Sequence, residues 1–236
     1  SWANKHEISF KGKFSKSISK NNTVSKLLDV LEEKKLLKNQ KFQIKINKHI
    51  PNKAGLGGGS MNAANILNYF ERKKIVKSSK NDLVKISKLV GSDVVLGLNP
   101  TYSILTSKNQ IKRFKNCETF FTLIVKPNFG CSTKDVFKKV RKFHKPKFNQ
   151  PHKSMFNIDY LKTVNNSLES VVLSKNLKLR KIKSFLENLS SPVFVRMTGS
   201  GSALVAYYQS KDSCENAKIQ FNKKYKNYWC IASKTI

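Results

Sequence analysis

The sequence predicts an α+β protein built of two parts, and three observations support this prediction. Short apolar segments with strand-like alternation are interspersed with amphipathic helical patterns along the 236 residues. A segment with four glycines, at 54–60, joins a predicted strand to a predicted helix. The last stretch has the order strand, helices, strand, turn, strand, helix, strand, which is the split βαβ arrangement of a ferredoxin-like domain. We therefore expect two domains, at 1–118 and 119–236.

The elements of the first domain follow from hydrophobic spacing and from helix caps. Ile8 and Phe10 alternate with polar neighbours, which predicts a strand close to the start of the sequence. After capping residues at 21–23, leucines at helical spacing predict a helix that extends to about Lys38. In order, this domain is expected to contain strand 8–10, helix 23–38, strand 42–46, the glycine segment, helices 63–70 and 81–90, and strands 101–106 and 111–114.

The second domain is also expected to alternate strands with helices. Pro127 to Gly130 breaks the pattern after its first strand, and 142–156 mixes lysine, proline, histidine and aromatic residues without a period, which predicts a loop. In order, the domain is expected to contain strand 119–125, helix 132–143, the loop, helices 158–172 and 177–189, strands 193–197 and 203–208, helix 212–225 and strand 228–232.

The formal net charge of +32 raises the question of a polyanion partner. Arginine occupies only five of the 46 basic positions, whereas proteins that recognise phosphates and bases favour arginine for its two parallel hydrogen bonds. The composition therefore favours a solvated lysine surface. Nucleic-acid binding, prompted by the charge and by the lysine and aromatic residues of 142–156, stays an alternative. The charge should also speed association with anionic nucleotides.

The four cysteines indicate neither a disulfide framework nor a zinc site, because they lie far apart and form no C-x-x-C pair. Free thiols fit a reducing compartment. No run approaches the roughly 20 apolar residues that a membrane-spanning helix needs, and no signal-peptide pattern opens the sequence. We expect a cytoplasmic protein without a membrane partner.

The glycine segment carries the clearest chemical signal. Glycines permit positive φ angles and close approach, so that successive N–H groups can converge on a phosphate. The following helix directs the positive end of its dipole at the same anion. The segment is neither a Walker loop nor a Rossmann fingerprint, and a flexible turn before a helix is the alternative interpretation. The predicted nucleotide contacts are Ala54, Gly55, Leu56, Gly57, Gly58, Gly59 and Ser60.

Proline, a short spacer, Gly-Leu-Gly-Gly-Gly-Ser and an alanine-rich helix resemble the second signature of the GHMP kinase superfamily. Four further stretches resemble one branch of it, in order and spacing: Asn47–Pro51, Ser60–Ala64, Gly91–Val94 and Met197–Gly201. The resemblance covers nearly the whole chain. It implies a two-domain GHMP kinase fold, with an N-terminal part like domain 2 of ribosomal protein S5 and a ferredoxin-like C-terminal part.

The resemblance also implies an activity. The branch transfers the γ-phosphoryl group of ATP to the 2-hydroxyl of a cytidine-diphosphate-linked methylerythritol, in the non-mevalonate route to isoprenoid precursors. ATP and Mg²⁺ would be the cofactors, and a cytidine diphosphate derivative would be the small-molecule substrate. GHMP kinases of the homoserine or mevalonate type, which use the same ATP loop, stay open as alternatives.

Roles for residues outside the loop follow from the same resemblance. Asp93, in an apolar segment after a helix stop, would orient the acceptor hydroxyl and take its proton as the catalytic base, and a turn aspartate is the alternative. Asn22 and Lys48 would flank the adenine, although a helix cap and a solvated strand end account for them equally well. Thr133 and Phe137 would contact the cytidine part, with a buried helix face as the alternative for Phe137.

The turn Met197–Ala203 resembles the third GHMP signature, whose loop packs beside the phosphate loop. Thr198, Gly199 and Ser200 would then touch phosphate or the reacting hydroxyl, and a β-hairpin turn is the alternative. Two departures from the family stand out. Relatives begin with a strand–loop–strand segment carrying a lysine and a Tyr-His pair that holds the cytidine; this sequence opens at Ser1 without it, so we expect half of the substrate pocket to be missing. Met61 replaces the usual Ser or Ala and removes a possible hydroxyl contact.

Overall fold

The computed structural model describes residues 5–16, 18–141, 143 and 145–235, and Ser1 lies outside this part of the chain. The chain divides into two compact units. The first unit runs to Asn52 and resumes over Gly57–Pro100, whereas the second takes in Lys53–Leu56 and everything from Thr101 onward. The glycine segment therefore contributes to both units. The segment that begins at Thr101 belongs to the second unit, whereas we expect the border after residue 118 from the sequence.

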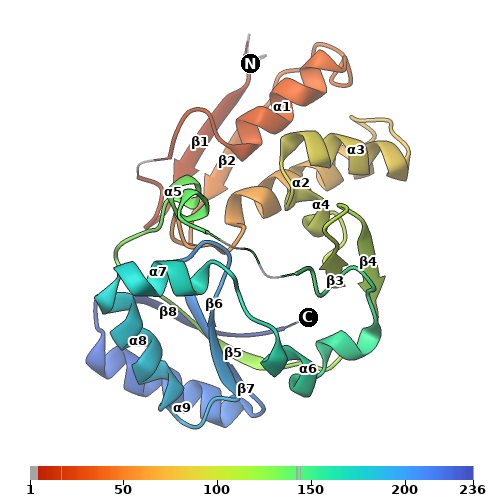
Figure 1. Ribbon diagram of the computed structural model, residues 1–236. Coiled ribbons are helices and arrows are strands. Elements are labelled where there is room, and N and C mark those ends of the chain that lie inside the picture. The colour runs from red at the N-terminus through yellow and green to blue at the C-terminus, as the bar shows by residue number, and fades with distance from the viewer. Residues whose placement is uncertain (1–4, 17, 142, 144, 236) are drawn as a thin grey trace. The chain divides into compact units, whose positions relative to one another are not determined.

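A parallel pair of strands is the framework of the first unit (Figure 1). β1 (Glu7–Lys11) pairs with β2 (Gln43–Asn47), with Ile8 opposite Ile44. Parallel strands need a crossover, and α1 (Thr23–Glu33) supplies it. Exposed and half-buried residues alternate along both strands, which confirms the predicted alternation.

Helices build the core of this unit. α1 packs against α2 (Gly58–Arg72) and α3 (Lys80–Val90), and the short α4 (Val94–Gly97) packs against α2 and α3. The fully buried large side chains are Leu27, Leu28, Leu31, Leu37 and Leu67. The predicted helix to Lys38 is too long: α1 ends at Glu33, because Lys35 adopts a left-handed conformation with φ of 56°. Leu37 packs into the core from the turns that follow.

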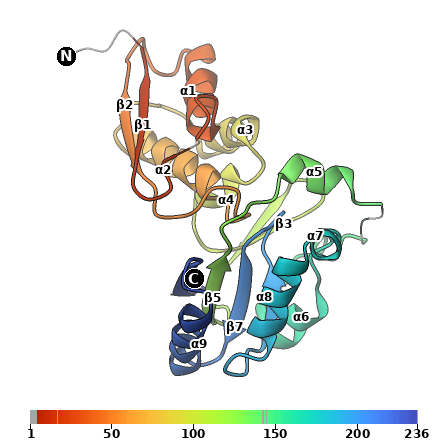
Figure 2. The same ribbon diagram turned by 90° about the vertical axis from the view of Figure 1, so that its left-hand side faces the viewer.

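An antiparallel sheet is the centre of the second unit. Its strand order is β6 (Phe194–Met197), β7 (Leu204–Tyr208), β5 (Phe121–Lys126) and β8 (Trp229–Lys234). With the chain order of these strands, this arrangement confirms the predicted split βαβ topology. α8 (Leu177–Glu187) packs against β6 and β7, and α9 (Lys211–Lys224) packs against β5, β7 and β8 (Figure 2).

The second unit also contains a hairpin and a 3₁₀ helix. β3 (Tyr102–Leu105) and β4 (Ile111–Phe114) form an antiparallel hairpin. The 3₁₀ helix η1 (Lys153–Phe156) lies against this hairpin, with the Phe156 ring centroid 5.3 Å from that of Tyr102. Of the predicted loop 142–156, residues 142 and 144 lie outside the described part of the chain.

Two helix predictions in this unit are wrong in extent. α5 (Thr133–Lys138) ends five residues before the predicted end at 143. The predicted helix 158–172 is broken into α6 (Ile158–Thr163) and α7 (Glu169–Lys175). The break occurs because the Asn166 side chain accepts a hydrogen bond from the Leu168 amide at 3.0 Å, a local turn that competes with the helix.

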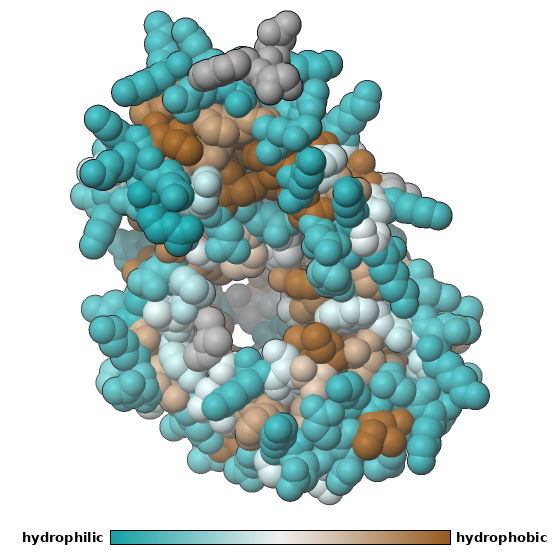
Figure 3. Space-filling view, turned by 180° about the vertical axis from the view of Figure 1, so that it is seen from behind, coloured by the Kyte–Doolittle hydropathy of each residue, from teal (hydrophilic) through white to brown (hydrophobic). Residues whose placement is uncertain are grey.

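The surface is mainly hydrophilic on the face that Figure 3 shows, with apolar residues in small patches. Among the residues that the structure describes, no helix has both the length and the apolar character for crossing a membrane. All four cysteines are free thiols.

Candidate functional site

The second half of the glycine segment forms the start of α2 in the first unit. Gly57 is the N-cap residue, and its φ of 65° and ψ of 13° place it in the left-handed region that favours glycine. No side chain in the described part of the chain caps this helix end, so the N–H groups of the first turn, from Gly58 to Ser60, have no side-chain acceptor there. Because the helix has 15 residues, its dipole adds partial positive charge at the same end. The arrangement suits an anion.

Lys48 adds a full positive charge beside this helix end. Its Nζ lies 3.8 Å from the position that a Cβ on Gly58 would take, and only 9% of the residue is exposed. None of the ion pairs among the described residues includes Lys48. Burial lowers the pKa of Lys48, because the ammonium group loses hydration. The interpretation as a solvated strand end is therefore wrong, and a bound anion would compensate this buried charge.

Asn22 has a structural role as the N-cap of α1. Its Oδ1 accepts from the amides of Val24 at 2.9 Å and Ser25 at 3.2 Å, while the Ser25 hydroxyl completes the capping box. Its Nδ2 donates to the carbonyl oxygens of Ser19 and Lys20. Both hydrogens and both lone-pair positions of the amide are thus used.

The starts of α1 and α2 lie close together in the first unit. A Cβ on Gly59 would be 3.1 Å from the Thr23 Oγ1, so only a very small residue fits there. A cavity of about 560 Å³ opens beside α1 and is lined by, among others, Phe10, Ile18, Asn22 and Ser25. Asn22 is therefore at the edge of a space large enough for a small organic group.

Asp93 stands at the start of α4, with its side chain exposed and not used as a helix cap. Among the described residues, the Ser92 hydroxyl is its hydrogen-bond partner and donates to Oδ1 at 3.3 Å. The end of α4, which follows Asp93, is held in place because the Asn68 side chain donates to the carbonyl oxygens of Gly97 and Leu98. The carboxylate is free to accept a hydrogen bond from a ligand hydroxyl.

Met61 holds α4 against α2. A Cβ on Gly97 would lie 2.9 Å from the Met61 sulfur and 2.7 Å from the Ala64 Cβ, so the two helices approach as closely as glycine permits. Since α2 begins at the glycine segment and α4 begins after Asp93, this packing fixes the Gly57 end and the aspartate on one scaffold. The methionine replaces a possible hydroxyl ligand with an apolar packing contact.

In the second unit, the first half of the glycine segment interlocks with the turn at 198–201. The Thr198 hydroxyl donates to the Gly55 carbonyl oxygen at 3.0 Å, and the Ala203 amide donates to the Ala54 carbonyl at 3.1 Å. A Cβ on Gly55 would lie 2.3 Å from the Thr198 carbonyl oxygen. A Cβ on Gly199 would lie 2.9 Å from the Gly55 carbonyl oxygen. The structure thus brings the two glycine turns side by side, as the resemblance implies.

Thr133 contacts the same turn, and Phe137 lies four residues further along α5. The hydroxyls of Thr133 and Ser200 share a hydrogen bond of 2.8 Å. Phe137 is 49% exposed, so it does not belong to a buried helix face, and its ring lies 6.2 Å from that of Phe143. Val136 supplies the buried contact of α5 instead. Phe137 is therefore available for stacking on a ligand.

Lys126 is a site-supporting residue that the sequence did not indicate. Only 5% of it is exposed, and its Nζ donates to the carbonyl oxygens of Pro127 at 2.7 Å and Phe129 at 2.5 Å. The Ser202 hydroxyl donates to the same Phe129 oxygen at 2.6 Å. Burial lowers the pKa of Lys126. The sequence did not indicate this role of Lys126, because its partners are backbone carbonyl groups rather than acidic side chains.

A metal ion held by the protein alone has no obvious place in the described part of the chain, which contains no group of three or more His, Cys, Asp or Glu residues suited to one. Mg²⁺ does not need such a group, because it is usually bound through substrate phosphates and water with only one or two protein ligands. Ser60, in the first turn of α2, carries an oxygen donor of the kind that Mg²⁺ prefers.

Comparisons with known proteins agree with this geometry. Residues 22–104 match the family model described as the GHMP kinases N terminal domain. The chain is 55% identical over 231 residues to a 4-diphosphocytidyl-2-C-methyl-D-erythritol kinase of Pelagibacter ubique, covering 98% of this chain and 82% of that protein. It is 32% identical to a protein of the same name from Clostridium beijerinckii, covering 80% and 69% of the two chains.

Solved structures support the fold. A crystal structure of 4-(cytidine 5'-diphospho)-2C-methyl-D-erythritol kinase matches with a TM-score of 0.73 at 20% identity, covering 97% of this chain and 82% of that one. Homoserine kinase from Cytophaga hutchinsonii matches with a TM-score of 0.71 at 15% identity, covering 99% and 83%. At these identities the structures establish the GHMP kinase fold alone, whereas the Pelagibacter relative at 55% identity establishes the family. The chain belongs to the 4-diphosphocytidyl-2-C-methyl-D-erythritol kinase family of the GHMP kinases.

Proposed function

We propose that this protein transfers the γ-phosphoryl group of ATP to the 2-hydroxyl of 4-diphosphocytidyl-2-C-methyl-D-erythritol, in the non-mevalonate pathway to isoprenoid precursors. The observation that carries this proposal is the buried Lys48 beside the uncapped, glycine-rich start of α2, in a chain 55% identical to a relative that bears this enzyme's name. The four free thiols fit the reducing conditions of the cytoplasm, where we place the reaction.

The nucleotide would be held by backbone and by one lysine. The N–H groups at the start of α2 and the Lys48 ammonium would bind the phosphates, with the residues of 54–60 forming the cradle. Direct hydrogen bonding of Asn22 to adenine would require breaking the α1 cap, which costs about 1 kcal/mol. We therefore propose that Asn22 lines the cavity for the nucleoside. Lys48 would make the charged contact to the phosphates.

The chemical step needs positioning and charge neutralisation more than covalent help from the protein. The substrate oxygen forms a bond to the γ-phosphorus, the bond between this phosphorus and the bridging oxygen of ADP breaks, and ADP leaves. Asp93 accepts the hydroxyl proton, for which its exposed and uncapped carboxylate is suited. Mg²⁺, when bound with the nucleotide, would neutralise charge on the phosphate oxygens, with Ser60 as a candidate protein ligand.

By resemblance to the family, the turn at 198–200 and α5 would supply contacts to the acceptor. Thr198, Gly199 and Ser200 would touch phosphate or the region of the reacting hydroxyl, since this turn is locked onto Gly55 of the nucleotide segment. The exposed Phe137 would stack on the cytosine, and Thr133, bonded to Ser200, would lie near it.

A turnover assay with the full-length protein tests the proposal. ADP release is measured with ATP and, separately, 4-diphosphocytidyl-2-C-methyl-D-erythritol, homoserine or mevalonate. We expect turnover that depends on the cytidyl substrate, with a product phosphorylated at the 2-hydroxyl by ³¹P NMR. If homoserine or mevalonate is turned over at the rate expected for the cytidyl substrate, the chain acts on another substrate. Tight, salt-sensitive RNA binding without any kinase activity would support the nucleic-acid alternative.

Replacing Lys48 by methionine should raise the KM for ATP by roughly 10- to 100-fold, because a charge-assisted contact is worth about 1.5–3 kcal/mol. Methionine keeps the chain length and fills the buried space without the charge. Lys45→Met is the matched control, since Lys45 lies on β2, three residues before Lys48, and is exposed. If both variants bind ATP as the wild type does, Lys48 is not a phosphate ligand.

A further inference from the structure

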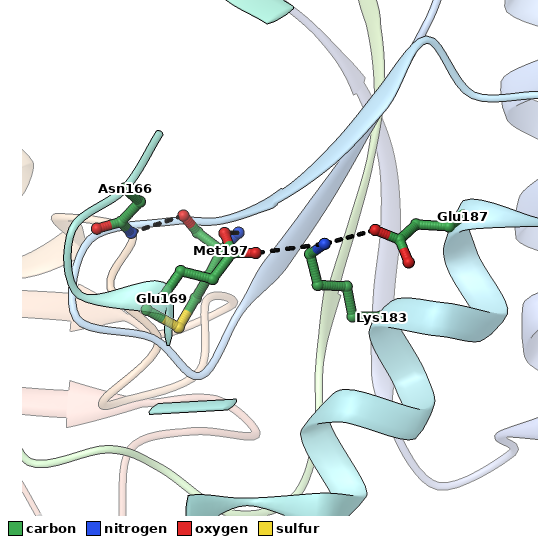
Figure 4. Close-up of polar contacts among 5 residues, drawn as sticks. All are labelled: Asn166, Glu169, Lys183, Glu187 and Met197. Atoms are coloured by element: carbon green, nitrogen blue, oxygen red, sulfur yellow. Dashed lines mark hydrogen bonds and ion pairs between the residues drawn. The ribbon is translucent and has the colours of Figure 1, made fainter. Parts of the chain in front are cut away.

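A clamp of three hydrogen bonds holds the backbone on both sides of Thr198. Figure 4 shows the residues that form the Met197 side of the clamp. The Asn166 Nδ2 donates to the carbonyl oxygens of Met197 at 2.9 Å and of Gly199 at 2.8 Å. The Met197 amide donates to the Glu169 Oε2 at 2.8 Å. Asn166, in the turn before α7, and Glu169, the first residue of α7, thus hold the peptide groups that flank Thr198, although they lie about thirty positions earlier in the chain.

The clamp is itself held in place. The Asn166 Oδ1 accepts from the Leu168 amide at 3.0 Å, and the Asn166 carbonyl accepts from the Glu169 amide at 3.0 Å. These bonds fix the Asn166 side chain so that its two N–H groups face the turn. Since Oδ1 is engaged on its own side, the amide cannot rotate by half a turn without losing both sets of bonds.

The other carboxylate oxygen of Glu169 forms an ion pair with Lys183. Its Oε1 lies 3.4 Å from the Lys183 Nζ, which also contacts the Glu187 carboxylate at 2.5 Å. The side chains of Glu169 and Lys183 are only 15% and 19% exposed, so the pair is weakly screened by water. Burial lowers the pKa of Lys183, but the two carboxylates outweigh it and the net pKa is raised. Lys183 therefore stays protonated and keeps Glu169 oriented.

We propose that Asn166 and Glu169 are positioning residues that fix the 198–200 turn for phosphoryl transfer, with Lys183 holding the Glu169 carboxylate. This inference rests on the proposed function, in which that turn touches phosphate or the reacting hydroxyl. The physical reason is geometric. Thr198 bonds to Gly55 and Ser200 bonds to Thr133, so a shift of the Met197 and Gly199 peptides displaces both contacts at once. Misplacement by about 1 Å can cost about 100-fold in rate.

Asn166→Asp tests the clamp most directly. The variant has nearly the same shape, but an oxygen replaces the donor group and faces two carbonyl oxygens. We expect kcat to fall by about 10- to 100-fold, with a smaller change in the KM for ATP, since the phosphates would be held mainly by the start of α2. Asn165→Asp is the matched control: it makes the same chemical change at the neighbouring, exposed position, and it should stay within about twofold of wild type.

A pair of variants at Glu169 separates positioning from folding. Glu169→Gln keeps an oxygen that can accept from the Met197 amide, whereas Glu169→Ala removes the acceptor. Hydrogen exchange of the Met197 amide should be fast in the alanine variant and slower in the glutamine variant, and kcat should recover in the same order. Melting temperatures identify any variant that is simply unfolded.

The outcomes are distinguishable. Equal kcat and equal Met197 exchange for Asn166→Asp and Asn165→Asp would overturn the inference, as would equal exchange for the two Glu169 variants. Absence of turnover in the wild-type protein would instead contradict the proposed function. In that case the exchange measurements still decide whether the clamp orders the turn.

Discussion

Replacing Asp93 by asparagine should lower kcat by about 10²- to 10⁴-fold, the usual contribution of a positioned general base. The carboxylate is exposed and bonded only weakly, through Ser92 at 3.3 Å, so it is available to a substrate hydroxyl. Asparagine retains the size and can still accept a hydrogen bond, but it cannot take the proton. The melting temperature and the KM for ATP should stay close to wild type, because the Asp93 side chain does not cap α4.

The same substitution at Asp212 is the control. Asp212 is an exposed aspartate on α9 of the second unit, and its replacement removes one negative charge without touching the proposed site. Steady-state kinetics of both variants, with product formation followed directly, give the comparison. If the Asp93→Asn enzyme has the kcat of the wild type, Asp93 is not the catalytic base and is only a turn residue.

Gly55→Ala should cause the largest loss of stability among single substitutions in the glycine segment. An alanine there would keep a φ of 72°, and its Cβ would meet the Thr198 carbonyl oxygen at 2.3 Å and the Gly201 amide nitrogen at 3.0 Å. The left-handed conformation alone costs about 1–2 kcal/mol, and the backbone contact must then be relieved by separating the two glycine turns. We expect a fall in melting temperature of at least about 4–8 °C, together with reduced turnover.

Gly57→Ala provides the internal comparison for this prediction. Gly57 has a similar φ of 65°, but a Cβ there would have nothing within 4 Å. The two variants therefore share the conformational cost, and only Gly55→Ala adds the collision. Thermal unfolding of both variants by circular dichroism measures the difference. Equal destabilisation would show that the contact between the turns is not held as tightly as the structure indicates.

Local pattern in the sequence predicted most elements because burial on one face imposes a period on the chain. The alternation of Ile8 and Phe10 gave β1, and the spacing of leucines gave α1. The split βαβ order of the second unit followed from the order of elements alone. The errors arose where one residue changed the local backbone: Lys35 ends α1 early, and the turn made by Asn166 divides a helix predicted as continuous.

The site was predictable only where its chemistry lies in contiguous residues. Glycines before an alanine-rich helix indicate a phosphate cradle, because φ freedom and the helix dipole are properties of a short segment. No such signal marked Lys126 or Glu169, whose partners are backbone groups of distant segments. Lys48 and Phe137 had two interpretations each, and burial excludes a solvated strand end for Lys48 and a buried helix face for Phe137.

The sequence by itself determined the class of fold, the order of the elements and the glycine segment that would bind phosphate. Tertiary structure alone decided that Lys48 is buried beside the start of α2, that Gly55 interlocks with the 198–201 turn, and that Asn166 and Glu169 clamp this turn. The physical reason is that periodicity and turn chemistry act over a few neighbouring residues. Burial and backbone hydrogen bonding depend instead on which distant segments the folded chain brings into contact.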